Sequence, residues 1–143
     1  MRTPASIARH PIHPMLVPIP IGLWIFSFVC DLAFVFGSGA SLWFTLGFYS
    51  MIGGMIGAVL AAIPGIVDML SLHGRPKSLA LTHMGLNLTI ILIYGVNVGM
   101  RIGQPAVAGL PLALSTIAVV MLGVSGWIGG HLVYVHRVAV DEP

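Results

Sequence analysis

The sequence predicts an all-α membrane protein in which four transmembrane helices form an up-down-up-down bundle, a single domain over residues 1–143. Three observations support this fold class. The chain is 57% hydrophobic and only 7% charged, whereas soluble domains carry about 25% charged residues. Four apolar segments are each long enough to cross about 30 Å of hydrocarbon as a helix. The links between them are short, so consecutive helices are expected to be antiparallel neighbours.

Helices are expected in these segments because lipid cannot hydrogen-bond an open backbone, and no segment alternates as barrel strands do. The predicted helices cover residues 15–36, 42–67, 79–100 and 109–135. Small residues recur at close-packing spacing in the second and fourth helices. They predict close contact between helices, either within the chain or in a homo-oligomer. The alternative is that the glycines leave room for a flat cofactor such as a porphyrin.

The basic residues predict the orientation in the bilayer. Arg101 lies on one side, and the other five lie with the two termini and the second link: Arg2, Arg9, Arg75, Lys77 and Arg137. Because cytoplasmic loops carry an excess of Lys and Arg, both termini are expected in the cytoplasm. A formal net charge of +2 is too small to indicate a nucleic-acid partner.

Two charged residues are predicted deep in the bilayer on the non-cytoplasmic side. Asp31 ends a polar stripe on the first helix and Arg101 ends a similar stripe on the third. An ionisable group at mid-span costs roughly 2.5–3.5 kcal/mol. An Asp31–Arg101 ion pair would neutralise both charges, and we predict it as a structural contact.

All histidines are predicted to gather at the cytoplasmic face: His10, His13, His73, His83, His131 and His136. Neutral imidazole is a common metal ligand, so the gathering predicts a metal or cofactor site, with interfacial histidines of no special role as the alternative. Prolines after His10 and His13 stiffen the segment before the first helix. His131 and His136 are about 140° apart around a regular helix. They are therefore not expected to face one point. If only one of them is a ligand, His131 is favoured, because it lies at the same depth in the membrane as His83.

Asp68 ends the second helix near these histidines. One interpretation is that it hydrogen-bonds a histidine and orients it as a ligand. The other is a salt bridge to Arg75 or Lys77, and the sequence does not choose between them.

The His10-Pro-Ile-His13-Pro segment, followed by a span that ends in Asp31, resembles a bacterial family catalogued as domain of unknown function 2231, predicted four-helix membrane proteins. The resemblance covers almost the whole chain and includes Gly65 and Asp68 at the end of the second helix. It is also carried by His83 with Asn87, and by Gly129-Gly-His-Leu-Val-Tyr134-Val-His136.

The resemblance implies a functional set of His10, His13, His83 and His136 rather than His73 or His131. Asp68, Asn87 and Tyr134 are expected beside these histidines. The family often has glycine after the last histidine, whereas this chain has Arg137, which makes His136 a less secure ligand. Some members look to be fused to Rieske or c-type cytochrome modules, which implies electron transfer in a bacterial inner membrane.

The leading functional hypothesis is a membrane-embedded electron-transfer or metal-binding protein. It would hold haem b or another transition metal among the four histidines, with His83 as first ligand and His13 or His136 opposite. Electrons would pass to a quinone or a partner redox subunit. The alternatives are a non-redox zinc, copper or nickel site, and an accessory structural subunit of a larger complex. Enzyme chemistry beyond a redox subunit is unsupported, since no nucleophile–base set, phosphate loop or carboxylate pair occurs.

Overall fold

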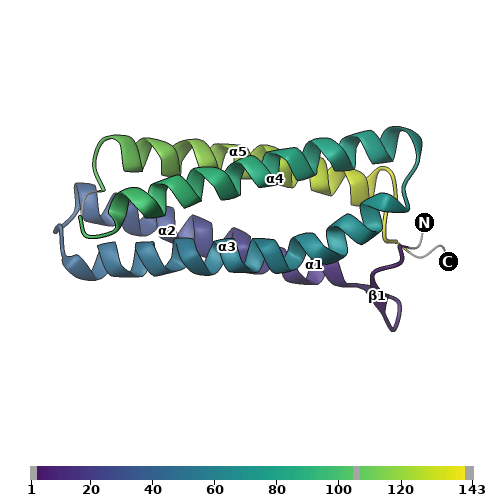
Figure 1. Cartoon of the computed structure of the whole chain (residues 1–143), viewed down its shortest axis with the longest axis horizontal. Helices are drawn as coiled ribbons and strands as arrows, with labels where there is room; N and C mark the ends of the chain where they lie inside the picture. The colour runs from purple at the N-terminus through teal and green to yellow at the C-terminus, as the bar shows by residue number, and fades with distance from the viewer. Residues whose placement is uncertain (1–2, 105–106, 141–143) are drawn as a thin grey trace.

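The computed structural model describes residues 3–104 and 107–140, which form a bundle of long antiparallel helices with both ends of the chain at the same end of the bundle (Figure 1). The elements are β1 (Ser6–Ile7), β2 (His10–Pro11), α1 (Ile12–Leu16), α2 (Pro18–Phe36), α3 (Ser41–Leu70), α4 (Gly74–Arg101) and α5 (Leu110–Tyr134). The segment from Ile12 to Phe36, and each of α3, α4 and α5, is long and apolar enough to cross a membrane. The predicted fold class of four transmembrane helices is confirmed.

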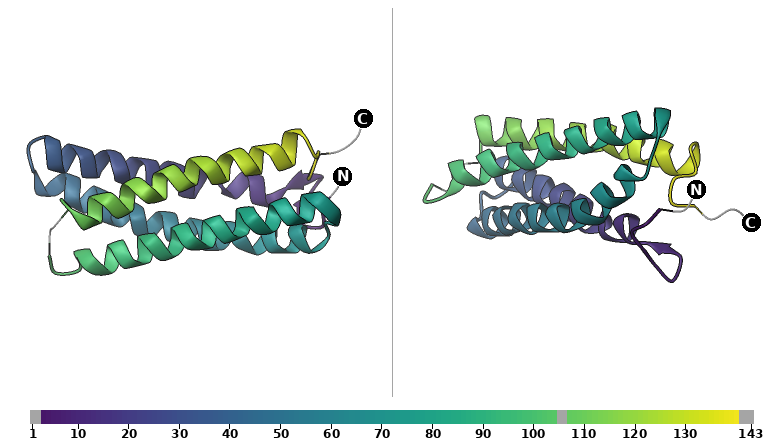
Figure 2. Two further views of the ribbon diagram at one scale, coloured as in Figure 1. Left: turned by 90° about the horizontal axis from the view of Figure 1, so that it is seen from above. Right: turned by 45° about the vertical axis from the view of Figure 1, so that its right-hand side comes forward.

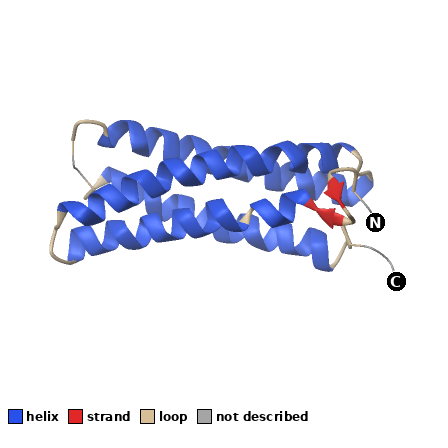
Figure 3. Ribbon diagram, turned by 90° about the horizontal axis from the view of Figure 1, so that it is seen from below, coloured by secondary structure: helices blue, strands red, loops and turns tan. Residues whose placement is uncertain are grey.

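The helices form two closely packed pairs. α2 packs on α3, and α4 packs on α5, while contacts of α3 with α4 and of α2 with α5 join the pairs (Figure 2). The small antiparallel hairpin of β1 and β2 lies at the end that holds the termini (Figure 3). The bundle is therefore a closed ring of four helices, and polar groups on their inner faces can meet along its axis.

The helices extend beyond the predicted ends of two spans. α3 continues to Leu70 and α4 begins at Gly74, so the link between them is residues 71–73 instead of 68–78. Hydropathy marks only the part of a helix within hydrocarbon, whereas the backbone stays helical into the headgroup region. Pro76 is tolerated because the N–H that proline lacks has no partner in the first turn of a helix.

The first span is divided into two helices. α1 ends at Leu16 and α2 begins at Pro18, which cannot donate a hydrogen bond to the preceding turn. His13 consequently lies inside the short helix α1, whereas the sequence predicted a stiff segment before the helix. The backbone at Val17 is itself helical, and Val17 and Ile21 each donate to the carbonyl four residues earlier. α1 therefore leads directly into α2, and it also packs against α3.

The glycines of α3 serve close contact with α2. A Cβ atom at Gly54 would lie 2.4 Å from Nε1 of Trp24, and one at Gly57 would lie 3.2 Å from Cδ of Pro20. Only glycine permits this approach, so the close-packing prediction is confirmed for this helix. On α5, a Cβ atom added at Gly123 or Gly126 would have no neighbouring atom within 4 Å, so these glycines do not serve a contact inside the described chain.

Two apolar clusters divide the core along the bundle axis. The central cluster contains the stacked rings of Trp24 and Tyr94, whose centroids are 4.8 Å apart with an interplanar angle of 10°. The second cluster lies at the end with the termini and contains Met69, Leu72, Ala80, Leu132 and Val138. Between these clusters, the buried residues of α3 and α5 are small or polar: Gly54, Gly57, Ala61, Pro64 and Asp68 on α3, and Ser125 on α5.

The opposite end of the core holds the predicted ion pair, which the structure confirms. Nη1 and Nη2 of Arg101 donate to Oδ1 and Oδ2 of Asp31 at 2.6 and 2.8 Å. Ser115 Oγ donates to Oδ2 at 2.7 Å, and Arg101 Nε donates to Asn97 Oδ1 at 2.9 Å. We call these four residues, from α2, α4 and α5, the ion-pair layer. All four are buried, so the two charges meet in a desolvated site.

Candidate functional site

His13 on α1 is held against the backbone of α3. Its Nδ1 lies 2.8 Å from the carbonyl oxygen of Ala61. Ala61 is one helical turn before Gly65, which also contacts the ring. A Cβ atom at Gly65 would lie 2.8 Å from the same Nδ1, which is too close for any other residue. The His13 ring therefore rests against the backbone of α3 at Gly65.

His83 on α4 is held in a similar way by α5. Its Nδ1 lies 2.9 Å from the carbonyl oxygen of Ser125, and a Cβ atom at Gly129 would lie 3.2 Å from its Cε1. Asn87 Nδ2 lies 3.2 Å from Nε2 of His83 and also donates to Ser125 Oγ at 2.8 Å. Each imidazole thus has a carbonyl on one neighbouring helix and a glycine that allows its close approach.

The two rings meet between the helix pairs. Their centroids are 6.3 Å apart with an interplanar angle of 90°, and both residues are half-buried. We call His13, Gly65, His83, Asn87, Ser125 and Gly129 the histidine layer. It lies between the two apolar clusters, so it is a polar site enclosed along the axis by hydrocarbon side chains.

The hydrogen bonds determine where each imidazole carries its proton. A carbonyl oxygen can only accept, so Nδ1 of His13 and Nδ1 of His83 must both donate. In the neutral ring, Nε2 then keeps its lone pair. Histidines that bind metals in proteins are oriented in this way, with the second ring nitrogen donating to a carbonyl or carboxylate. Nε2 is therefore the nitrogen through which either ring could bind a metal, although in His83 it already accepts a hydrogen bond from Asn87 Nδ2.

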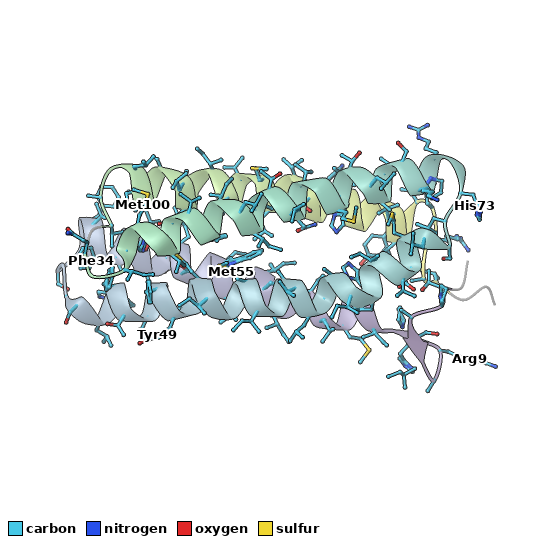
Figure 4. All side chains as sticks on the ribbon, viewed as in Figure 1. Arg9, Phe34, Tyr49, Met55, His73 and Met100 are labelled. Atoms are coloured by element: carbon cyan, nitrogen blue, oxygen red, sulfur yellow. The ribbon has the colours of Figure 1, made fainter. Side chains whose placement is uncertain are left out.

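The structure does not bring the other predicted ligands to this pair. His10 is exposed on β2 with its Nδ1 2.8 Å from the carbonyl of Ala8, and His73 is exposed in the loop between α3 and α4 (Figure 4). Within residues 3–104 and 107–140, no three His, Cys, Asp or Glu side chains are grouped as a metal site. A four-histidine site is therefore absent from the described part of the chain.

His136 is paired with His131 instead. Their ring centroids are 5.2 Å apart, although the sequence predicted that they could not share one point. That prediction assumed a regular helix through both residues, whereas α5 ends at Tyr134 and the chain then turns. The N–H groups of Val135 and His136 both donate to the carbonyl of His131, and this turn folds the second ring back beside the first.

Of the three residues predicted beside the histidines, Asn87 contacts one, whereas Asp68 and Tyr134 have no described hydrogen bond to any histidine. Asn87 contacts His83, as expected. Asp68 accepts a hydrogen bond from the backbone N–H of Ala5 at 2.8 Å; in the described chain neither a histidine nor Arg75 or Lys77 pairs with it. Asp68 thereby fastens the N-terminal segment to α3. Tyr134 is 85% exposed and makes no described hydrogen bond to a histidine.

Ser125 is the site residue that sequence reasoning did not identify. It is 1% exposed, and both its carbonyl and its hydroxyl contact His83 or Asn87. The signal in the sequence was a hydroxyl within an apolar span, four residues before Gly129. The Ala61 carbonyl had no sequence signal of its own, because every residue carries that group.

The comparisons with known proteins give one match. The profile of a family described as "Predicted membrane protein (DUF2231)" matches residues 9–142. No curated protein matches the chain, and neither does any solved structure. The match therefore covers the whole helical bundle and the histidine layer without a described activity.

Proposed function

The chain belongs to the DUF2231 family of predicted membrane proteins, and from its histidine layer we propose that it binds haem b through His13 and His83 and works in membrane electron transfer. The observation that carries this proposal is the matched arrangement of the two rings. Each imidazole donates Nδ1–H to a backbone carbonyl of a neighbouring helix, which leaves Nε2 as the nitrogen that would bind the iron.

The separation of the rings supports one shared metal atom. Two imidazoles that bind an atom from opposite sides have centroids about 6 Å apart, because each metal–nitrogen bond is about 2.0 Å and the nitrogen lies about 1 Å from the ring centre. The distance between the His13 and His83 centroids is 6.3 Å. The donor chemistry would also fit, since imidazole is a usual protein ligand of haem iron.

The number of available ligands favours haem over a bare ion. Haem would need only two ligands from the protein, which His13 and His83 would supply. A structural zinc ion takes a tetrahedral set from the protein, and the described residues offer no third His, Cys, Asp or Glu at this site. Gly65 and Gly129 each leave room for the imidazole that lies against them.

When bound, haem would supply one-electron redox chemistry. The residues of this chain would hold and orient it. Ala61 and Ser125 fix the two ring orientations through their carbonyls, and Asn87, which has further partners in the His83 carbonyl and Ser125 Oγ, can release Nε2 of His83. The apolar clusters on either side would exclude water from the pair.

The proposal includes a location and partners. Both termini and the histidine layer would lie toward the cytoplasm of a bacterial inner membrane, on the distribution of Lys and Arg. A quinone or a redox subunit would exchange the electrons. A homo-oligomer contact through Gly123 and Gly126 is part of the proposal, because a Cβ atom added at either glycine would have no neighbouring atom within 4 Å.

The test is visible spectroscopy of the purified protein, oxidised and reduced, together with metal analysis. We expect a Soret band, sharp α and β bands on reduction, and one haem per chain. His13→Ala and His83→Ala should each abolish these signals. His10→Ala and His73→Ala are matched controls on exposed histidines and should retain them.

Two outcomes would contradict the proposal. Stoichiometric zinc, copper or nickel without a Soret band would indicate a bare-metal site. A protein with neither haem nor metal after expression with haem supplied would indicate an accessory structural subunit.

A further inference from the structure

Two hydroxyl groups in the middle of the bundle have no partner among the described residues. They are Oγ of Ser27 on α2 and the phenolic oxygen of Tyr94 on α4. The two residues are 1% and 0% exposed. A buried hydroxyl without a hydrogen bond costs about 1–3 kcal/mol, and in a membrane span lipid offers no replacement partner.

Both hydroxyls lie beside the ion-pair layer. Ser27 is on the face of α2 that carries Trp24 and Asp31, three residues after the first and four before the second, and such neighbours lie on one side of a helix. Tyr94 stacks on Trp24 and lies on the buried face of α4 that also carries Asn97 and Arg101, three and seven residues later. The two groups therefore border the same region, between the Trp24 ring and the Asp31 carboxylate.

The ion pair also has unused hydrogen-bonding capacity on this side. Oδ2 of Asp31 accepts two hydrogen bonds, from Arg101 Nη2 and Ser115 Oγ, whereas Oδ1 accepts one, from Arg101 Nη1. A carboxylate oxygen has two lone pairs, and each terminal guanidinium nitrogen has two N–H groups. One lone pair on Oδ1 and one N–H on Nη1 consequently have no described protein partner.

We propose that this region is a binding site for internal water, in which at least one molecule bridges Ser27 Oγ, the Tyr94 hydroxyl and Oδ1 of Asp31. A buried water typically makes about three hydrogen bonds to polar groups that lack other partners. The three protein atoms supply that number. A buried ion pair is stabilising only when its remaining lone pairs and protons are satisfied, so the water completes the ion-pair layer.

The site gives the bundle a second polar centre, independent of the proposed haem site. It is separated from the histidine layer by the Trp24–Tyr94 stack and the surrounding central cluster. Its ligand is a small neutral molecule that both donates and accepts hydrogen bonds. Tyr94 and Ser27 are therefore positioning residues for that molecule, in addition to being core residues.

A double-mutant cycle in thermal unfolding tests the proposal on the full chain in detergent. Ser27→Ala and Tyr94→Phe should each lower the Tm by roughly 3 °C, because the water loses one of its partners. The double variant should lose less than the sum, since both changes act on one water. Tyr49→Phe is the matched control on α3, at a tyrosine that is 67% exposed, and should leave the Tm unchanged.

An increase in Tm for either single variant would overturn the proposal, because it would mean that an unsatisfied hydroxyl had been removed. Additive losses would overturn it as well, since they exclude a shared molecule. An experimental structure of the wild-type chain gives a reading that needs no variant. Density for a water within hydrogen-bonding distance of Ser27, Tyr94 and Asp31 would support the site, and protein acceptors for both hydroxyls without such density would contradict it.

Discussion

The bundle has two polar layers, in which polar side chains inside a membrane-spanning bundle find their partners in different ways. In the ion-pair layer, Asp31 and Arg101 are fully charged groups that neutralise each other through two short hydrogen bonds. In the histidine layer, Nδ1 of His13 and Nδ1 of His83 donate to backbone carbonyls. Charge is balanced by charge at one end, and imidazole rings are held by the backbone at the other.

The difference shows which layer is suited to bind something. The strongest groups of the ion-pair layer are engaged with each other, and Asp31 and Arg101 are each 1% exposed. The two imidazoles use only one ring nitrogen each on the backbone, and they are half-buried. The ion-pair layer therefore determines how α2, α4 and α5 fit together, whereas the histidine layer is the place where we propose that a ligand binds.

The largest expected effect comes from breaking the ion pair. Arg101→Ala should lower the free energy of unfolding by about 3–5 kcal/mol, because it leaves the Asp31 carboxylate buried without its cation. The measurement is unfolding in mixed detergent micelles, followed by circular dichroism.

The control is the double variant Asp31→Leu with Arg101→Met. Replacing a buried ion pair by apolar residues of similar volume is often neutral or stabilising, so this variant should recover most of the loss and retain any cofactor bound by the histidine layer. A loss of less than about 1 kcal/mol in Arg101→Ala, as in exposed salt bridges, would show that the ion pair is solvated. The ion-pair layer would then not determine how α2, α4 and α5 fit together.

The sequence was sufficient to predict the spans and the ion pair, for physical reasons. Hydrocarbon thickness requires long apolar segments, and these are directly visible. The cost of an isolated charge in lipid requires a partner, and Asp31 and Arg101 were the candidates at equal depth. Both predictions depend on the position of a residue along the bilayer normal, which alternation of antiparallel helices determines.

The histidine set could not be predicted in the same way, because it depends on local packing and on a turn. His13 lies beside His83 where α1 packs against α3, with its ring against the Ala61 carbonyl and Gly65. His136 meets His131 only because α5 ends at Tyr134. Depth is common to all these histidines, so it could not distinguish them. Ring orientation is decided by glycines and carbonyls on other helices.

A smaller effect is expected at the glycine beneath His13. Gly65→Ala places a methyl group 2.8 Å from Nδ1 of His13, so the ring must move away from the Ala61 carbonyl. Overpacking of this kind costs about 1–3 kcal/mol, and the proposed haem should be lost or bound more weakly. Thermal unfolding and the Soret absorbance of the same preparation measure both consequences.

Gly123→Ala on α5 is the matched control, since no atom lies within 4 Å of its Cβ position. It should be neutral, or stabilising by about 0.5–1 kcal/mol, because alanine favours a helix interior over glycine. Equal effects of the two substitutions would mean that Gly65 acts through helix propensity alone and that the backbone does not position the His13 ring.

The smallest expected difference compares two asparagines on α4, one in each layer. Asn97 accepts from Arg101 Nε and donates to the Pro111 carbonyl and to Ser115 Oγ, and it is fully buried. Asn97→Ala leaves a charged donor without its acceptor, which costs about 1.5–3 kcal/mol. Asn87 is half-buried, and its contacts are with neutral groups of His83 and Ser125.

Asn87→Ala should therefore cost only about 0.5–1.5 kcal/mol, the net value of an ordinary hydrogen bond. Chemical or thermal unfolding of the two variants side by side measures the difference. We expect Asn97→Ala to lose about 1 kcal/mol more unfolding free energy than Asn87→Ala. The Soret absorbance adds a second reading: Asn87→Ala should preserve haem binding, because the carbonyl of Ser125 still orients His83 through Nδ1. A larger loss at Asn87 than at Asn97 would mean that the histidine layer, and not the ion pair, carries the packing of α4 against α5, and the roles assigned to the two layers would have to be exchanged.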